Sequence, residues 1–207
     1  THFEELNSIL NKVKKISSTY FDSIHHSFNS IRASNRLNFK KLEANIFEKL
    51  PELFSDVKRN SDIKVFGLLN KKRVYKYTIN DIVEDNGNLN AYKVLVPKAN
   101  GTGAIGEVLS TPLIGYTRTF ISFGAFDNRK EAENCLKYVK TKFARTMLGI
   151  LKITQNNETS RVWSYVPLQN FTNNSDIDWT KSITDIDKQL YKKYGLSDKE
   201  INFIEEK

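Results

Sequence analysis

The chain has 207 residues, 39% of them apolar and 12% aromatic, which is enough to bury a sizeable core and excludes global disorder. Its single cysteine, Cys135, excludes an internal disulfide framework and a cysteine-rich metal site. A lone cysteine fits a reducing cytosol, so we expect a cytoplasmic protein. No apolar run is long enough to cross a bilayer, and no signal-peptide pattern opens the chain. The start without Met and the end on Lys207 predict a fragment of a longer polypeptide.

The formal net charge of +8 is unevenly distributed. Residues 58–76 carry seven Lys or Arg and one Asp, a net charge of +6. Residues 128–152 carry seven Lys or Arg and two Glu, a net charge of +5. Residues 172–207 carry six basic and eight acidic residues, a net charge of −2. Two basic segments suit a polyanionic partner, because each phosphate that is neutralised releases counterions. Solvated helix and hairpin faces are the alternative interpretation.

The first part of the chain is predicted to be helical. Apolar residues recur every three or four positions over residues 3–28, and a second helical pattern covers residues 38–50. Pro51 disfavours helical geometry at Leu50, which therefore ends the second helix. Two helices in this position indicate a helical connector, residues 1–57.

From residue 63 the apolar period changes to two. Residues 63–79 predict a β-hairpin with a basic tip, and residues 92–97 and 113–123 predict further strands. The segment Gly101–Gly106 has dinucleotide-fingerprint spacing, but Pro112 follows too soon for the helix that such a site requires. We therefore predict a glycine loop there.

The next predicted element is a long amphipathic helix over residues 128–150. Asn128 and Glu131 have the spacing of a capping box, and an apolar stripe follows with lysines and arginines on the other faces. Cys135 lies beside this stripe, which predicts a buried, inert thiol.

The last part of the chain, from residue 161, predicts shorter elements. Residues 161–167 form a short strand, and residues 185–194 form a helix that Gly195 closes. Ser197 and Glu200 form a second capping box at the start of a final helix. The predicted fold is α+β: the helical connector, then a mixed or antiparallel sheet with a long amphipathic helix and C-terminal helices, in a second domain of residues 58–207.

Catalytic and metal-binding patterns are poorly represented. The three histidines are His2, His25 and His26, and no Cys/His spacing accompanies them, so no metal site is predicted. His25 and His26 are expected on different faces of the first helix. A serine hydrolase would need a nucleophile elbow, and a metal-dependent nuclease would need an acidic spacing that the chain lacks outside its last residues.

Five blocks, in order, resemble the C-terminal end of bacterial adenine-specific DNA methyltransferases from restriction–modification systems. They are residues 92–98 (Tyr-Lys-Val-Leu-Val-Pro-Lys), 121–126, 131–145, 165–169 (Tyr-Val-Pro-Leu-Gln) and 190–205. The resemblance departs at Asn170, where an acidic residue is expected, and at Ala144, where an aromatic one is expected. It covers about the second half of the chain.

The resemblance implies that this chain is the target-recognition domain of such an enzyme, or of a single-chain enzyme in which a nuclease is fused to it. The Asn-Pro-Pro-aromatic and Phe-x-Gly-x-Gly motifs of those methyltransferases are absent. The chain is therefore expected to be non-catalytic and to hold no cofactor, with S-adenosylmethionine bound by the catalytic domain of the parent protein. Its expected partners are double-stranded DNA and that catalytic domain. A nuclease domain or a protein-interaction module of the same system is the alternative.

Basic and amide side chains are the candidate DNA contacts. Phosphate contacts position a duplex, whereas contacts to base edges in the major groove specify sequence. Arg and Lys suit guanine, and Asn suits adenine. The candidates for phosphate are Lys58, Arg59, Lys98, Lys140 and Arg145, and those for bases are Lys71, Lys72, Arg73, Arg118, Asn100 and Thr102. Arg145 equally suits a buried contact within its own domain.

Overall fold

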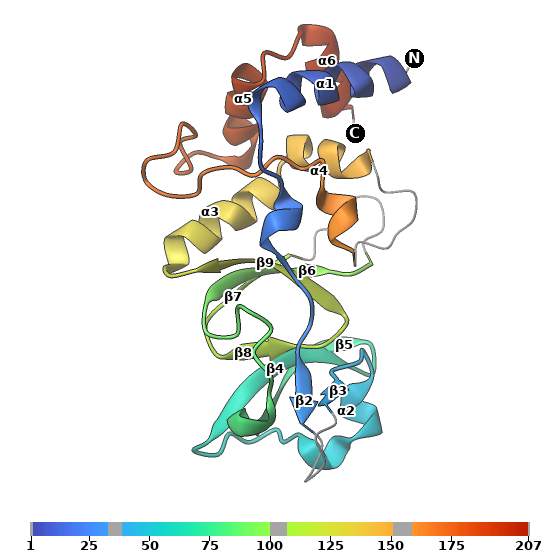
Figure 1. Ribbon diagram of the computed structural model, residues 1–207, viewed down its shortest axis with the longest axis vertical. Coiled ribbons are helices and arrows are strands. Elements are labelled where there is room, and N and C mark those ends of the chain that lie inside the picture. Colours follow the sequence, from blue (N-terminus) through green and yellow to red (C-terminus); the bar gives the residue numbers. More distant parts are fainter. Residues whose placement is uncertain (1, 33–38, 100–106, 151–158, 207) are drawn as a thin grey trace.

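The structure, a computed structural model, describes residues 2–32, 39–99, 107–150 and 159–206. It confirms the predicted α+β class, with an N-terminal helix, then strands, and helices again at the C-terminal end. Along the long axis the longer helices are followed by one sheet and then by a second sheet, beside which a short helix lies (Figure 1). The predicted glycine loop at 101–106 lies outside the described residues.

The α-helices vary in length from one turn to four. They are α1 (His2–Ile16), α2 (Ile46–Lys49), α3 (Arg129–Val139), α4 (Lys142–Gly149), α5 (Ile183–Lys193) and α6 (Asp198–Glu205). The first and last of these pack side by side, so segments from the two ends of the sequence share one layer (Figure 1). The predicted helices 128–150, 185–194 and 197 onward correspond to α3 with α4, to α5 and to α6.

The strands form two larger sheets and one small one. They are β1 (His25–His26), β2 (Ser30–Arg32), β3 (Phe39–Lys41), β4 (Asp62–Leu69), β5 (Lys72–Ile79), β6 (Tyr92–Pro97), β7 (Val108–Ser110), β8 (Ile114–Tyr116) and β9 (Phe120–Phe126). The four-stranded sheet is antiparallel in the order β1-β9-β6-β7, the three-stranded sheet has the order β5-β4-β8, and β2 pairs with β3.

The predicted hairpin is confirmed as β4 and β5, which pair antiparallel over eight residues each. β8 adds to β4 in parallel on the other side. Gly67 in β4 allows a close approach: a Cβ there would lie 2.6 Å from Thr117 Cγ2 and 2.8 Å from Phe47 Cε2. The predicted strand 92–97 matches β6 at both ends.

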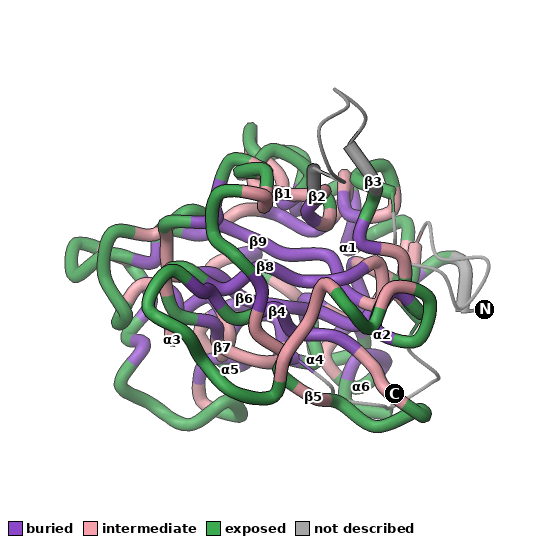
Figure 2. The backbone as a smooth tube through the Cα atoms, turned by 90° about the horizontal axis from the view of Figure 1, so that it is seen from below, coloured by how far each residue is buried: buried purple, intermediate pink, exposed green. Residues whose placement is uncertain are grey.

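Three apolar cores hold these layers together. The largest lies between the helices and the four-stranded sheet and contains an aromatic group of Phe21, Tyr138, Trp163, Phe171 and Trp179. A second core joins the two larger sheets, and a third packs α2 under β4. Figure 2 shows the buried backbone of β4, β6, β8 and β9 running through the middle of the molecule, with exposed segments around it.

Local capping signals read from the sequence are confirmed. Asn128 accepts the Glu131 N–H at 2.9 Å at the start of α3. Ser197 and Glu200 form the complete capping box of α6. Gly195 follows α5 with a φ of 59°, a left-handed conformation that glycine adopts without strain. Cys135 is fully buried, as predicted, and burial raises the pKa of its thiol.

The prediction of helices over 3–28 and 38–50 was wrong in extent. α1 ends at Ile16, before Ser17 and two further polar residues that favour non-helical backbone. The chain then extends: Phe21 donates its N–H to Val166 O at 2.9 Å, and His25 and His26 form β1 against β9. Residues 39–41 form β3, so only α2 remains of the second helix.

The predicted strand 113–123 is two strands. A turn at residues 117–119, closed by the Phe120 N–H on Thr117 O at 3.0 Å, separates β8 from β9. The chain thereby passes from the three-stranded sheet to the four-stranded one. Two partner sheets, which are not visible in the local pattern, cause this break.

Two further elements differ from the prediction. The helix over 128–150 is divided because Thr141 accepts the Ala144 N–H at 3.1 Å and so caps a new helix, α4. Residues 161–167 are not a strand; Ser160–Trp163 form a 3₁₀ helix whose Trp163 is buried. Burial of this large side chain against the aromatic group outweighs the local β pattern.

The division after residue 57 remains a prediction about independent folding. Residues from before it contribute to the cores: Ile9 and Val13 pack with the C-terminal helices, and Leu42 and Phe47 pack under Val65 of β4. The segment contains β1, β2 and β3 in addition to its helices.

Candidate nucleic-acid interface

The tip of the β4–β5 hairpin presents consecutive cations. Its two-residue loop, Asn70 and Lys71, has positive φ angles of 50° and 62°, as a type I′ turn requires. The Asn70 N–H donates to Glu48 Oε1 at 3.1 Å, which ties the loop to α2. Lys71, Lys72 and Arg73 are all exposed.

Two further predicted contacts lie beside this tip. The Arg73 guanidinium carbon lies 5.5 Å from the centroid of the Phe120 ring. The residue before Phe120, Thr119, accepts the backbone N–H of Lys98 at 2.8 Å. Arg118 belongs to the same turn. Arg73 and Lys98 thus each contact the segment 117–120, which contains Arg118 and joins the two larger sheets.

Arg118 has a neighbouring carboxylate. Its Nη1 lies 3.3 Å from Glu43 Oε2, with both side chains about two-fifths exposed, and its guanidinium lies 5.9 Å from the Phe28 ring centroid. An ion pair between exposed partners contributes about 0–1 kcal/mol. Exchange of the Glu43 carboxylate for a phosphate would therefore weaken the fold little.

Lys58 and Arg59 lie at the opposite end of the hairpin from the tip. Lys58 is exposed. Both the backbone N–H and the Nε of Arg59 donate to Asp62 Oδ2, at 3.0 and 3.2 Å. Since β4 spans eight residues at about 3.3 Å each, Lys58 and Arg59 are separated from the hairpin tip by roughly 25 Å.

Lys140 and Arg145 lie on the helical side of the four-stranded sheet, away from the hairpin (Figure 1). Lys140 is half-buried at the end of α3. Arg145 Nη2 lies 3.0 Å from Glu107 Oε1, and the Glu107 side chain is only 3% exposed. Arg145 thus makes the contact within its own domain that the sequence left open.

Two residues that the sequence analysis did not select extend the cationic surface. Lys64 is exposed, and its ammonium lies 5.5 Å from the centroid of the Tyr75 ring. Tyr75 is 40% exposed and stacks on Phe66, its cross-strand neighbour. The period-two pattern of the hairpin, which places Lys64 and Phe66 on one face, was the signal that could have identified them.

Lys93 was also missed, and it is fully buried. Its ammonium donates to the carbonyl oxygens of Asn88, Leu89 and Ala91, at 2.8, 3.3 and 3.3 Å. Burial lowers the pKa of Lys93 to about 8, against the opposing influence of Asp85. These hydrogen bonds fix the loop before β6, so Lys93 serves the fold and does not contribute to the cationic surface.

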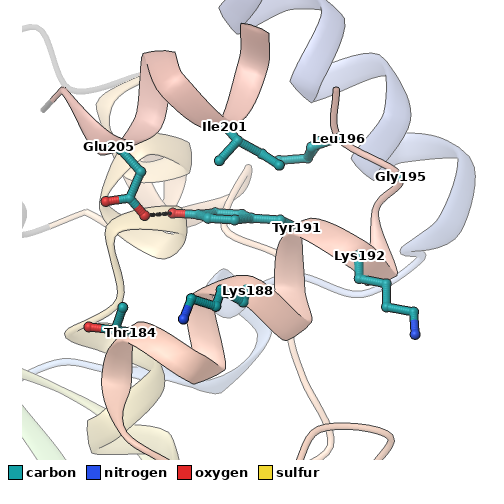
Figure 3. Close-up of a pocket in the computed structure, with 8 residues that line it drawn as sticks. All are labelled: Thr184, Lys188, Tyr191, Lys192, Gly195, Leu196, Ile201 and Glu205. Carbon is teal, nitrogen blue, oxygen red and sulfur yellow. Dashed lines mark hydrogen bonds between the residues drawn. The ribbon is translucent and has the colours of Figure 1, made fainter. Parts of the chain in front are cut away.

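A separate apolar pocket of about 660 Å³ lies between α5 and α6 (Figure 3). Its lining comprises Thr184, Lys188, Tyr191, Lys192, Gly195, Leu196, Ile201 and Glu205. Tyr191 donates its hydroxyl to Glu205 Oε1 at 2.8 Å across the pocket. This hydrogen bond belongs to the packing of the two helices.

The remaining predicted contacts, Asn100 and Thr102, lie outside the described residues.

Within residues 2–32, 39–99, 107–150 and 159–206, no three His, Cys, Asp or Glu side chains are grouped so as to hold a metal ion. In the same ranges, none of the helices has the length and apolar character needed to span a membrane. Comparison of the chain with protein-family models, curated proteins and solved structures found no match.

Proposed function

We propose that this chain recognises a specific sequence in double-stranded DNA, as the specificity domain of an adenine-specific DNA methyltransferase in a restriction–modification system. The observation that carries the proposal is the group of exposed cations at the hairpin tip, Lys71, Lys72 and Arg73, next to Lys98 and Arg118. The five sequence blocks that resemble such enzymes support it independently. In this proposal the chain acts in the cytoplasm, catalyses no reaction and holds no cofactor, and the parent's catalytic domain binds S-adenosylmethionine.

The shape of the tip suits a duplex. A two-stranded β-ribbon fits the major groove of B-DNA, which is about 12 Å wide. The two-residue loop makes the β4–β5 ribbon narrow at its end, and the loop residues point their side chains outward. Arg73 has the bidentate geometry for guanine O6 and N7, and Lys71 can donate to the same atoms.

The surrounding residues suit the phosphates on either side of the groove. Lys98 and Arg118 lie at the turn of residues 117–119, next to the Phe120 ring over which Arg73 lies. With about five phosphate or base contacts by cations, the affinity would fall about 500-fold between 50 and 200 mM salt. Arg59 and Arg145, which bind carboxylates of the same chain, are expected to contribute less.

The test is selection from a randomised duplex pool, followed by affinity measurement at about 50 and 200 mM salt. The triple variant K71A/K72A/R73A should lose sequence enrichment and most of the salt dependence. Its matched control is K15A/K188A/K192A, which removes the same charge from exposed positions on α1 and α5. That control should bind as the original chain does, apart from a small uniform loss.

Three results would decide against the proposal. Equal losses in the two triple variants would show that net charge, and not the tip, drives binding. Binding without an enriched sequence would indicate a nonspecific clamp. No binding, even with the parent's catalytic domain restored, would favour a protein-interaction module, and cleavage of plain duplex with metal would favour a nuclease domain.

A further inference from the structure

One face of the hairpin carries a row of stacked groups that crosses from one sheet to the other. The Tyr75 ring stacks on Phe66 with centroids 4.7 Å apart and planes at 28°. Phe66 in turn stacks on Phe120, at 4.5 Å and 22°. Lys64 lies over Tyr75 and Arg73 lies over Phe120, each with its charge 5.5 Å from the ring centroid. The order is cation, three rings, cation.

Only one ring of this row is accessible. Phe66 and Phe120 are 4% and 0% exposed, whereas Tyr75 is 40% exposed. The two inner rings therefore act as a rigid backing that fixes the plane of the outer one. Holding an aromatic ring in place before a ligand arrives reduces the entropy lost on stacking. Tyr75 is thus an ordered platform at the solvent surface of a sheet.

The surroundings of Tyr75 are cationic. Lys64 is exposed, so its ammonium can leave the ring at small cost and pair with a phosphate. Arg73 lies two residues from Tyr75 on the same face of β5, and no Asp or Glu lies between them on that strand. An aromatic platform between two cations matches a nucleotide, whose base stacks while its phosphate binds the charge.

We infer that Tyr75 is a stacking site for one unpaired nucleobase, with Lys64 binding the phosphate of the same nucleotide. The inference deepens the proposed DNA recognition and rests on it: the base is one that is displaced from the recognised duplex. Fully paired bases present only their edges, because their faces are covered by neighbouring pairs. Tyr75 can therefore distinguish distorted from regular DNA without reading sequence.

The experiment compares three labelled probes by fluorescence anisotropy: a fully paired duplex, the same duplex with a one-nucleotide bulge, and the single strand. Y75A should bind the bulged duplex and the single strand at least about fivefold more weakly, with the paired duplex unchanged within about twofold. Y75F keeps the ring and should match the original chain. I79A removes an exposed apolar side chain, 43% exposed, from the same face of β5 and serves as the matched control.

The outcomes separate this inference from the proposed function. If Y75A binds all probes as the original chain does, the stacking site is overturned and duplex recognition stands. An equal loss on all three probes also overturns it, because the ring then serves ordinary duplex docking. Tyr75-dependent binding of the single strand without duplex binding would retain the site and overturn duplex recognition. Thermal unfolding of each variant identifies any general loss of structure.

Discussion

The two basic segments of this chain have nearly the same net charge, but their cations make different contacts. In residues 128–152, four cations bind groups of the same molecule: Arg129 with Glu133, Lys137 with Trp179 O, Lys142 with Glu205, and Arg145 with Glu107. In residues 58–76, Arg59 pairs with Asp62 and Lys76 pairs with Asp56, both away from the tip. At and near the tip, Lys64 and Arg73 lie over rings, and Lys71 and Lys72 are exposed.

A count of charges therefore does not identify a binding surface. An internal carboxylate makes a cation part of the fold, and its loss is expected to change stability. A cation over a ring retains its charge for a partner, and its loss is expected to change affinity. The following predictions test whether the two segments separate in this way.

The largest expected effect is on stability, from Arg145. R145A leaves the Glu107 carboxylate buried without its cation, and breaking such a pair should lower the free energy of unfolding by about 3 kcal/mol. Urea unfolding measures this loss, and DNA affinity should stay within about twofold. R129A, which breaks an exposed pair, should change stability by less than about 0.5 kcal/mol. A loss of DNA affinity in R145A without a stability change would contradict the comparison.

Glu200 should make the helical layer sensitive to acid. Burial alone would raise its pKa, but hydrogen bonds from Lys12, Ser197 and Ser8 lower the pKa to about 2. The carboxylate therefore stabilises the fold fully above pH 4.5, and this contribution disappears as the pH falls from 4.5 towards 2. E200Q should cost about 2 kcal/mol at pH 7, and the difference should vanish near pH 2. Thermal unfolding of the original chain and of E200Q from pH 2 to pH 7 measures this difference in stability. A difference that stays constant over that range would contradict the prediction.

Lys93 belongs to neither basic segment and should behave in a third way. Its folded pKa, about 8, lies below the usual value of 10.5, so between these values the unfolded chain holds the proton and the folded chain does not. Stability from this group therefore rises with pH, by about 1–2 kcal/mol from pH 7 to pH 9.5. K93M should lack this rise. Unfolding of both proteins across that pH range gives the difference, and parallel profiles would contradict it.

The smallest predicted effect is that of K71G, which should raise the stability of the fold while it lowers the affinity for DNA. Lys71 has a φ of 62°, which glycine adopts more easily. K71G should therefore raise the free energy of unfolding by about 0.5–1 kcal/mol. It should also reduce affinity for the selected sequence more than affinity for a random duplex, because Lys71 is proposed to donate to a base edge. If K71G weakens the fold, the left-handed conformation at Lys71 costs no free energy, and if it weakens binding to all sequences equally, Lys71 makes no base contact.

Elements set by nearby residues were predictable from the sequence. The β4–β5 hairpin, the Asn128 and Ser197 caps and the Gly195 helix end all depend on side chains within a few positions. The stripe along α3 and α4 predicted their buried face, but Thr141 was not recognised as a cap within it. Local chemistry thus determined element type better than element length.

The candidate site was less predictable, because distant segments build it. The basic tip followed from the hairpin pattern alone. The approach of Lys98 and Arg118 to the tip depends on the turn at residues 117–119, and the carboxylate beside Arg145 comes from a residue thirty-eight positions earlier. The row of stacked rings that begins at Tyr75 includes Phe120, which comes from the other sheet. Such pairings are absent from any local pattern.

The turn at residues 117–119 also has a mechanical consequence. It joins β8, which pairs with the hairpin strand β4, to β9, on which α3 packs. A load on the hairpin therefore has a short transmission path into the helical layer, through three residues and two strands. If a bound duplex displaces the tip, residues 117–119 would pass that displacement on to β9 and to α3.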